Sequence, residues 1–324
     1  MADNHIFVTG ATGFIGQSVM KRLLQNAYPV TALLLHGESE EPVKGATIVR
    51  GDITRPSSLS GLLEGHQTVI HIAGAVGYQS WKNCRMINRD GMHHIVNEAV
   101  VAGIKRFIHI SSVSVYGRVS DVPIDEDFPL KKIGDPYGDT KIEAERILRE
   151  AAKRNNLDIT ILRPTAIYGK GDIKFLPSLI RNLKSGKFRM IGDGNQTVDL
   201  VNVADVADSV LIVLENDRSI GKTYNIAQSG NPTWNEFLAF LSAELNLALT
   251  EKHIPYQVAY TASGLMELIS VITRNPPRIS RYAIRLVGKQ YIYVTDRIRN
   301  ELGFSPAIGL KEGIQECLSD IKQV

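Results

Sequence analysis

Short apolar segments alternate with amphipathic segments through the first half of this chain. The apolar runs predict buried strands at residues 5–9, 30–35, 47–50, 69–72, 107–110 and 159–162. Between most of these runs, apolar positions recur at helical spacing, most clearly in residues 14–26, 88–101 and 136–155. Strands and helices that alternate in this way form a parallel sheet with helices on both faces. The pattern therefore predicts an α/β fold with a doubly wound parallel sheet.

The second half of the chain is patterned more loosely. We expect helices at residues 175–183 and 203–214. Another helix should begin at Thr233, because Glu236 stands three residues later and completes a capping box. Residues 222–227 are predicted to form a late strand that returns to the main sheet.

Composition and charge narrow the class of protein. Hydrophobic residues make up 44% of the chain and charged residues 22%, which excludes disordered and fibrous proteins. The net charge is small, 37 − 34 = +3, and no dense basic run occurs, so we expect no nucleic-acid partner.

Cysteines and histidines show no pattern typical of a metal site. Cys84 and Cys317 lie far apart in the sequence, and no histidine pair has a metal-binding spacing, so we expect neither a disulfide framework nor a metal. The chain begins without a signal-peptide pattern and contains no apolar run long enough to span a bilayer. These features predict a soluble, cytoplasmic protein.

Three glycines follow the first predicted strand at the spacing G-x-x-G-x-x-G, and a predicted helix follows them. Gly10 permits a tight turn, Gly13 lets the backbone approach a pyrophosphate, and Gly16 lets the helix pack closely on the strand. The helix N-terminus adds N–H donors and positive potential. This context predicts a dinucleotide site rather than a glycine-rich turn that binds nothing. The residues within the turn and at the start of the helix, Thr12, Phe14 and Ile15, are then expected to lie beside the cofactor.

Two later strand ends supply further candidates for cofactor contacts. Asp52, followed by Ile53, closes the third strand, where its carboxylate could accept a hydrogen bond from an adenine amino group or could instead cap a turn. Ala73 and Gly74 end the fourth strand with small residues, as a backbone beside a bound cofactor requires. His71, just before them, is expected to be a packed strand residue.

The end of the second strand carries no clear determinant of cofactor choice. An acid there selects NAD by binding the ribose 2′-hydroxyl, whereas an arginine accepts the 2′-phosphate of NADP. The two positions are occupied by Leu34 and Leu35. His36 could donate to a phosphate, but the acids at positions 38, 40 and 41 would repel one. We therefore expect NAD or NADP as cofactor, with weak discrimination between them.

Tyr137 and Lys141 stand four residues apart in a predicted helix and so share one helical face. They follow a serine-rich segment, residues 111–117, at the end of the fifth strand, where doubly wound folds place ligands. A free tyrosine has a pKa of about 10, so proton transfer near pH 7 requires about 4 kcal/mol of phenolate stabilisation. A nearby lysine ammonium and the positive ring of an oxidised nicotinamide can supply it.

With these motifs the chain resembles the extended short-chain dehydrogenases/reductases, a superfamily that includes NAD-dependent epimerases and dehydratases. The matching positions, in the family's order, are residues 9–16, Asp52, 71–74, Asn88, 111–117, 137–141 and 163–169. The resemblance implies a Rossmann-type dinucleotide-binding domain over residues 1–168, joined by late elements near 199–227. It also implies a smaller mixed α/β lid over residues 169–324, which binds a small-molecule substrate.

The same resemblance assigns candidate site residues. Ser112, Tyr137 and Lys141 align with the catalytic serine, tyrosine and lysine of the superfamily, and Tyr137 and Lys141 also contact the cofactor. Ser111 and Ser114 are the alternatives to Ser112. Relatives commonly dimerise through the helices that flank the sheet, so a homodimer is expected.

The second half of the chain separates the branches of the superfamily. Nucleotide-sugar enzymes of this superfamily carry an asparagine and an arginine that bind the phosphates of the substrate. In this chain Ala166 and Val198 occupy those two positions. Pro164, just before Ala166, is expected to border the cofactor. Residues 276–282 and 294–304 resemble the 3β-hydroxysteroid dehydrogenase-like and dihydroflavonol reductase-like branch. The resemblance thus implies an NAD(P)-dependent oxidoreductase that interconverts an alcohol and a ketone on a bulky, largely apolar substrate. The alternatives are a nucleotide-sugar epimerase or dehydratase, and a non-catalytic redox sensor.

Residues 257–273 form the most apolar segment of the second half. Glu267 is their only charged residue, and a helical spacing relates Val258, Ala262, Leu265, Ile269 and Ile272. We expect a helix that lies in the core or lines the pocket. The alternative is a helix that touches a membrane, aided by the cations beyond it, Arg274, Arg278, Arg281 and Arg285.

Overall fold

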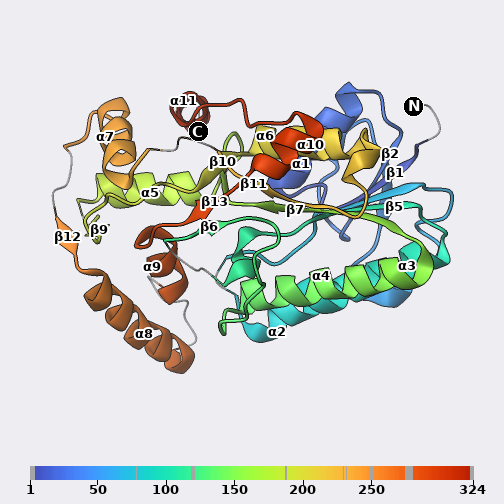
Figure 1. Cartoon of the computed structure of the whole chain (residues 1–324), viewed down its shortest axis with the longest axis horizontal. Helices are drawn as coiled ribbons and strands as arrows, with labels where there is room; N and C mark the ends of the chain where they lie inside the picture. Colours follow the sequence, from blue (N-terminus) through green and yellow to red (C-terminus); the bar gives the residue numbers. More distant parts are fainter. Residues whose placement is uncertain are drawn as a thin grey trace.

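Seven parallel strands form the central sheet of the computed structural model, which describes residues 4–77, 79–117, 121–186, 188–228, 230, 232–248, 252–273 and 280–321 (Figure 1). The strands are β1 (Ile6–Thr9), β2 (Val30–Leu34), β3 (Thr47–Arg50), β4 (Thr68–His71), β5 (Arg106–Ile110), β7 (Asp158–Pro164) and β11 (Thr223–Ile226). They run in the order β3-β2-β1-β4-β5-β7-β11, which confirms the six expected strands and the late one. The order reverses between β1 and β4, and doubly wound folds bind ligands at the carboxyl ends of strands at such a point.

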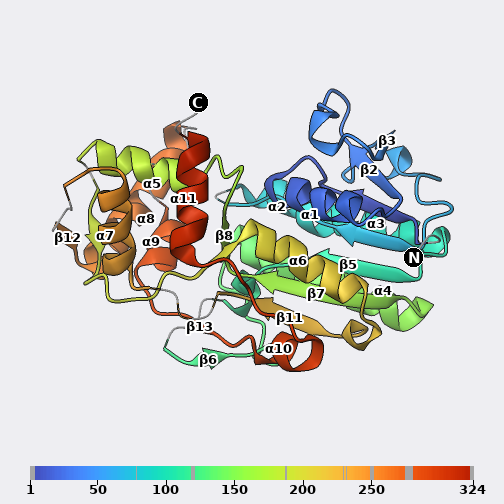
Figure 2. The ribbon, with the colours of Figure 1, turned by 90° about the horizontal axis from the view of Figure 1, so that it is seen from above.

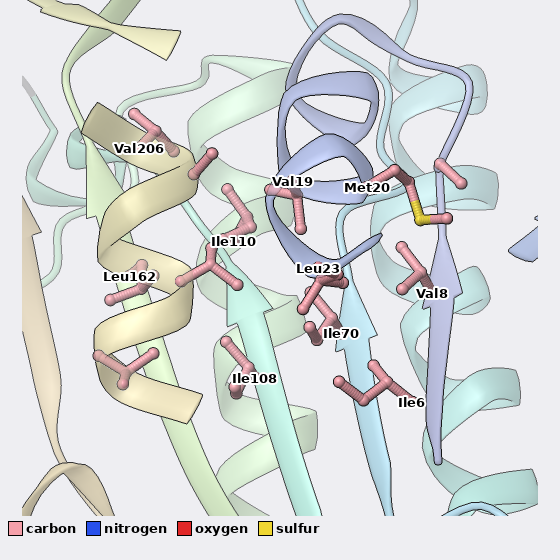
Figure 3. Close-up of a cluster of buried hydrophobic side chains, with 14 of the residues drawn as sticks. Ile6, Val8, Val19, Met20, Leu23, Ile70, Ile108, Ile110, Leu162 and Val206 are labelled. Carbon is pink, nitrogen blue, oxygen red and sulfur yellow. The ribbon is translucent and has the colours of Figure 1, made fainter. Parts of the chain in front are cut away.

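Helices cover both faces of the sheet, as the alternating pattern predicts (Figure 1). On one face lie α1 (Phe14–Gln25) and α6 (Val203–Leu214), and on the other lie α3 (Gly91–Val101) and α4 (Pro136–Asn155). Figure 3 shows Val19 and Leu23 of α1 and Val206 of α6 packed in one cluster with side chains of the strands, among them Ile70, Ile108 and Ile110. Because helices cover both faces, β1, β2 and β4 are buried along their whole length rather than at alternate positions, whereas the edge strand β3 is only partly buried.

The helix expected at residues 88–101 begins differently in the structure. A short helix α2 (Trp81–Cys84) leads into a π-helical turn, η3 (Arg85–Asp90), and α3 starts only at Gly91. A Cβ on Gly91 would lie 2.8 Å from Cδ1 of Ile53, so glycine lets this junction pack tightly. Apolar periodicity cannot distinguish a π-turn from an α-helix, and π-turns frequently mark functional sites.

Most of the C-terminal half forms a smaller lid beside the sheet, whereas α6 and β11 return to the sheet (Figure 2). A second apolar core lies among α5 (Phe175–Lys184), α7 (Trp234–Glu244), α11 (Leu310–Ile321) and the parallel pair β8 (Ala166–Tyr168) and β10 (Leu200–Asn202). The capping box expected at Thr233 and Glu236 is confirmed at the start of α7. The predicted mixed α/β character of this half is therefore present.

Apart from two helices within residues 256–287, the remaining elements of the described chain are short. They are β6 (Pro123–Ile124), β9 (Met190–Ile191), β12 (His253–Ile254), β13 (Ile292–Tyr293), α10 (Asp296–Leu302), η1 (Glu41–Val43), η2 (Pro56–Ser58), η4 (Val113–Tyr116) and η5 (Asp217–Ser219). Among the described residues, no helix combines the length and the apolar character needed to cross a membrane.

The expectation that the helix at residues 257–273 lies in the core is wrong, whereas the expectation that it lines the pocket stays a prediction. The segment forms α8 (Tyr256–Thr273), which lies beside α9 (Arg281–Val287), but its large side chains Val258, Leu265 and Ile269 are exposed. The positions that it buries carry the small residues Ala259 and Ser263. The side chain of Ile272 and all of Arg274 and Arg278 lie outside the described residues.

Candidate functional site

The glycine turn after β1 is held against the end of β4. Gly10 has a φ of +71°, and a Cβ there would lie 2.6 Å from the backbone nitrogen of Ala73. A Cβ on Gly16 would overlap the carbonyl oxygen of Gly10. Both positions therefore require glycine, and the narrow turn lies beside Ala73, as expected for residues that border a dinucleotide.

The N-terminus of α1 is suited to an anion. Its N-cap is the exposed Gly13, so no N-cap side chain accepts hydrogen bonds from the first turn, and no acid stands in that turn. Ile15 packs against the core, while Thr12 and Phe14 are partly buried. Free backbone donors and a positive helix end fit the pyrophosphate of a dinucleotide.

Tyr137 and Lys141 lie on one face of the first turns of α4. The N-cap of the helix is Asp135, whose carboxylate accepts a hydrogen bond from the backbone nitrogen of Gly138 at 3.2 Å. Both site side chains are buried. Lys141 Nζ donates to the carbonyl oxygen of Ile110, the last residue of β5, at 2.9 Å. The start of α4 is thus fastened to the strand end that precedes the serine-rich turn.

Asn88 joins the end of β4 to α4, a role that the sequence did not reveal. Its Oδ1 accepts from the backbone nitrogen of Ala75 at 2.8 Å, and its Nδ2 donates to Thr140 Oγ1 at 3.1 Å. A Cβ on Gly74 would lie 3.3 Å from Asn88 Oδ1 and 3.4 Å from Lys141 Nζ. Asn88 and Lys141 therefore meet at Gly74. The only signal in the sequence is the match of Asn88 to the family pattern, because its contacts depend on the π-turn.

The three serines after β5 have different surroundings. Ser111 is buried, and its hydroxyl donates to Glu145 Oε1 at 2.6 Å. Ser112 is partly buried, and its Oγ accepts from the backbone nitrogen of Ser114 at 3.2 Å and from its hydroxyl at 2.8 Å. A Cβ on Gly138 would lie 2.8 Å from the carbonyl oxygen of Ser114, so this turn touches the start of α4. The arrangement favours Ser112 or Ser114 over Ser111 as the serine that faces a ligand.

A buried ion pair lies behind these residues. Glu145, one helical turn after Lys141, accepts from Arg163 Nε at 2.9 Å and from its Nη2 at 2.6 Å. Arg163 also donates to the hydroxyl of Tyr116 at 2.8 Å. Burial by itself raises the pKa of Glu145, but Arg163 and the hydroxyl of Ser111 hold that pKa below its usual value. The pair binds α4, β7 and the serine turn together, and loss of either partner would leave an uncompensated buried charge.

Lys141 is the charged member of a buried group that also contains two imidazoles. Burial lowers the pKa of Lys141 to about 8, and the charge of Glu145 partly opposes this effect. His71 and His109 stack with their ring centres 5.4 Å apart. Burial, together with the charge of Lys141, lowers the pKa of His71 to about 3 and that of His109 far below its usual value. His71 forms a hydrogen bond with Thr9 Oγ1 at 2.7 Å and is the packed strand residue that we expected.

The low pKa of Lys141 predicts a pH-dependent stability. A lysine in the unfolded chain has a pKa of about 10.4. Between about pH 8 and that value the unfolded chain binds more protons than the folded chain, so the free energy of unfolding should rise with pH, by about 3 kcal/mol at most. Denaturant titrations at several pH values should show this rise for the wild-type chain and not for Lys141→Met. An equal rise in the variant would assign the effect to another group.

The other expected cofactor residues have mixed surroundings. Asp52 caps a turn, because its Oδ1 accepts from the backbone nitrogen and the hydroxyl of Thr54, both at 2.8 Å. A contact with adenine would have to use Oδ2, which lies 3.8 Å from Arg55 Nε. Ile53 is buried, His36 is exposed in the loop after β2, and Pro164 ends β7. Over the described ranges, no group of three or more His, Cys, Asp or Glu side chains could hold a metal ion.

Arg50 is a candidate cofactor residue that the sequence analysis missed. It ends β3 and pairs in register with Leu34, at the end of β2. Its Nη1 donates to the carbonyl oxygens of Leu35 at 2.8 Å and Glu38 at 2.9 Å, and its Nη2 forms an ion pair with Glu40. Strand pairing thus brings an arginine against the loop where the 2′ position of the cofactor ribose is expected.

Arg50→Gln should weaken the binding of NADP more than that of NAD, because only NADP offers a 2′-phosphate to the guanidinium. Competition from Glu40 should keep the two cofactors within about tenfold of each other, or 1.4 kcal/mol, in the wild-type chain. Glu40→Gln should shift the preference toward NADP. Calorimetric titrations at one salt concentration measure all these constants. Equal losses for both cofactors in Arg50→Gln would contradict the assigned contact, and a wild-type gap above about a hundredfold would contradict weak discrimination.

Comparison with known proteins extends over almost the whole chain. The family described as "NAD dependent epimerase/dehydratase family" matches residues 6–227. The chain is 27% identical to 2-alkyl-3-oxoalkanoate reductase of Stenotrophomonas maltophilia, over 96% of this chain and 97% of that protein. It is 30% identical to the decarboxylating sterol-4-alpha-carboxylate 3-dehydrogenase of Mus musculus, over 96% of this chain and 89% of that protein.

A solved structure shares the fold. The UDP-glucuronic acid 4-epimerase from Bacillus cereus in complex with NAD superposes with a TM-score of 0.77 at 24% identity, over 98% of this chain and 99% of that one. The family match runs from β1 to the end of the sheet at β11 and includes the glycine turn, Asn88, the serine turn, and the Tyr137–Lys141 pair. The chain therefore belongs to the NAD-dependent epimerase/dehydratase family, and it is an NAD-dependent enzyme of the extended short-chain dehydrogenase/reductase type.

Proposed function

We propose that this protein is an NAD(P)-dependent oxidoreductase that interconverts an alcohol and a ketone on a bulky, largely apolar substrate, with Ser112, Tyr137 and Lys141 as its catalytic residues. Two relatives bear names of this class, an oxoalkanoate reductase and a sterol carboxylate dehydrogenase. The observation that carries the proposal is the environment of Val198 and Ala166, where nucleotide-sugar enzymes have phosphate-binding side chains.

Val198 is fully buried in the apolar core of the lid, in the cluster that contains Leu176 and Leu179. Ala166 packs against the same core, and its backbone nitrogen already donates a hydrogen bond to the carbonyl oxygen of Asp199 at 3.2 Å. A diphosphate needs charge and hydrogen-bond donors, and these two positions supply neither. Their burial supports a substrate without a nucleotide diphosphate.

The segment between Gly74 and Asn88 supports an apolar substrate. It carries three exposed apolar side chains, Val76, Trp81 and Met86. The segment begins at the backbone that borders the expected cofactor site, and Val76 lies two residues after Gly74. Contact with an apolar substrate would remove the surface of these side chains from water, which is favourable.

In the proposed mechanism, Tyr137 exchanges a proton with the substrate oxygen. Its hydroxyl gives the proton to the developing alkoxide during reduction, and its phenolate takes the proton from the alcohol during oxidation. Lys141, buried and held by Ile110, supplies the positive charge that stabilises the phenolate. The Oγ of Ser112 accepts two hydrogen bonds from Ser114, and in the proposed mechanism its own hydrogen is donated to the substrate oxygen.

A nicotinamide dinucleotide bound at this site would supply the hydride chemistry at the carbinol carbon. The backbone donors at the start of α1 would hold its pyrophosphate, and Ala73 and Gly74 would border it at the end of β4. Lys141 would also donate to the ribose hydroxyls. Asn88 acts as a positioning residue, because it fixes the backbone of Ala75 and the hydroxyl of Thr140 in α4.

A substrate panel tests this function. The purified chain is mixed with reduced cofactor and apolar ketones, and the absorbance of the reduced nicotinamide is followed. Ketone-dependent oxidation of the cofactor that Tyr137→Phe abolishes is the expected result. Turnover of a nucleotide sugar without net consumption of cofactor would assign an epimerase instead. Cofactor binding without turnover of either class would assign a sensor, and either outcome overturns the proposal.

A further inference from the structure

The helix α8 presents its large apolar side chains to water. Five of them, which we call the α8 patch, are each between 38% and 64% exposed: Val258, Leu265, Met266, Leu268 and Ile269. The patch belongs to the lid, and α8 lies at the opposite end of the molecule from α3 (Figures 1 and 2). Exposing aliphatic side chains to water is unfavourable, so a group of them on one exposed helix is stabilised when another surface covers it. Such a patch marks an interaction surface.

Contacts on the other side of α8 fix its orientation. Three cations of α9 and the turn after it each touch α8: Arg281 pairs with Glu267 at 2.7 Å, Arg285 donates to the hydroxyl of Tyr260, and Lys289 lies 4.7 Å from the ring centre of Tyr256. The three cations are spaced four residues apart, two in α9 and one just after it, and their partners lie on one side of α8. The patch cannot turn inward without breaking them.

The region around α8 and α9 is strongly basic. Residues 252–294 contain six Lys or Arg and one acid, a net charge of 6 − 1 = +5, whereas the whole chain carries 37 − 34 = +3. The rest of the chain is therefore negative, at 3 − 5 = −2. The one acid, Glu267, is already paired with Arg281. Apolar side chains on one side of a helix with cations behind them are typical of segments that lie on anionic bilayers.

A second copy of this chain fits the patch less well. From Val258 to Ile269 the patch is about 16 Å long and, like any helix face, about 10 Å wide. One partner of a stable protein complex buries about 800 Å², which is far more than this face offers. Two copies would also bring together two segments of like charge. Binding to a bilayer requires no minimum interface area, because side chains enter its interface one by one, and an anionic bilayer does not repel a basic segment.

We propose that the α8 patch inserts into the interface of an anionic lipid bilayer, with α8 lying parallel to the membrane surface. Leu265, Leu268 and Ile269 enter the boundary between headgroups and acyl chains, and the cations of α9 attract the anionic headgroups. The lid is then the part of the molecule that faces the bilayer. This docking does not rest on the proposed oxidoreductase function, since lipid contact requires neither cofactor nor substrate.

Vesicle flotation of the full chain tests the proposal. The wild-type chain should float with vesicles of phosphatidylcholine and phosphatidylglycerol, and a smaller fraction of it should float with vesicles of phosphatidylcholine alone. The double variant Leu265→Gln, Ile269→Gln should bind roughly a hundredfold more weakly, about tenfold for each side chain that no longer enters the apolar region. The matched control is Val101→Gln, because Val101 is 82% exposed on α3, far from the patch, and this variant should bind as the wild-type chain does.

Added salt should weaken binding to the anionic vesicles, because it screens the attraction. The thermal unfolding midpoint of the double variant should match that of the wild-type chain, because both replaced side chains are exposed. The proposal is overturned if the wild-type chain does not float with vesicles, if the double variant binds equally well, or if anionic lipid and salt have no effect. Self-association without vesicles that the double variant loses would assign the patch to a protein interface and would also overturn it.

Discussion

Tyr137→Phe should lower kcat by about 10²–10⁴-fold, because it removes the hydroxyl that exchanges a proton with the substrate oxygen in the proposed mechanism. The side chain of Tyr137 is buried at the start of α4, and phenylalanine retains its ring there. The fold and the affinity for the cofactor should therefore persist. Steady-state rates with a ketone from the substrate panel, together with calorimetric titration of the cofactor, measure both parts of this expectation.

Two further variants make the result specific. Tyr116→Phe removes another buried hydroxyl, which bonds Arg163 and Asn225, and should reduce stability by about 1–3 kcal/mol with a much smaller loss of kcat. Lys141→Met should lose turnover and also bind the cofactor more weakly, since Lys141 is proposed to serve both. An active Tyr137→Phe enzyme would contradict the role of Tyr137. Unchanged cofactor affinity in Lys141→Met would contradict the ribose contact.

Gly13→Val should weaken dinucleotide binding by at least about 100-fold, or 2.7 kcal/mol. A branched side chain at this N-cap would occupy the space through which the pyrophosphate approaches the first turn of α1. Gly13 is exposed, its φ is −72°, and a Cβ there would lie 3.2 Å from the carbonyl oxygen of Gly10. The fold should accept the change with a small adjustment, so that the variant reports on binding.

The same substitution at the neighbouring glycines would not be informative. At Gly10 or Gly16 an added Cβ would meet backbone atoms too closely for the turn to form. Gly309 provides the matched control, because it has no positive φ and a Cβ there would meet nothing within 4 Å. Gly309→Val should retain full cofactor affinity in calorimetric titrations. Unchanged affinity in Gly13→Val would refute the site at the glycine turn.

The sheet and the positions of its motifs could be predicted from the sequence. Most strands contain a short apolar run, and the glycine turn and the Tyr137–Lys141 pair are encoded within eight residues or fewer. Such patterns depend on local geometry, since strand and helix periods fix which residues share a face. The sequence did not decide which of Ser111, Ser112 and Ser114 faces the ligand. That choice depends on Glu145, which lies on another element and binds Ser111.

Contacts between residues that lie on separate elements could not be predicted from the sequence. Arg50 reaches the loop after β2 only because β2 and β3 pair in register, and Asn88 reaches α4 only through the π-turn. Neither contact leaves a periodic trace in the sequence. The low pKa of Lys141 likewise arises from burial beneath several elements, and residue type cannot report burial.

The helix α8 shows this division most clearly. A helix with an apolar side at residues 257–273 follows from the sequence, because apolar residues recur there at the helical period. The sequence does not show which positions of that helix are buried: in the structure Ala259 and Ser263 are buried, while Leu265 and Ile269 face water. The physical reason is that periodicity specifies which side chains share a face, whereas burial depends on which neighbour reaches that face. The neighbour here is α9, whose cations hold the opposite side of α8 and leave its aliphatic side chains exposed.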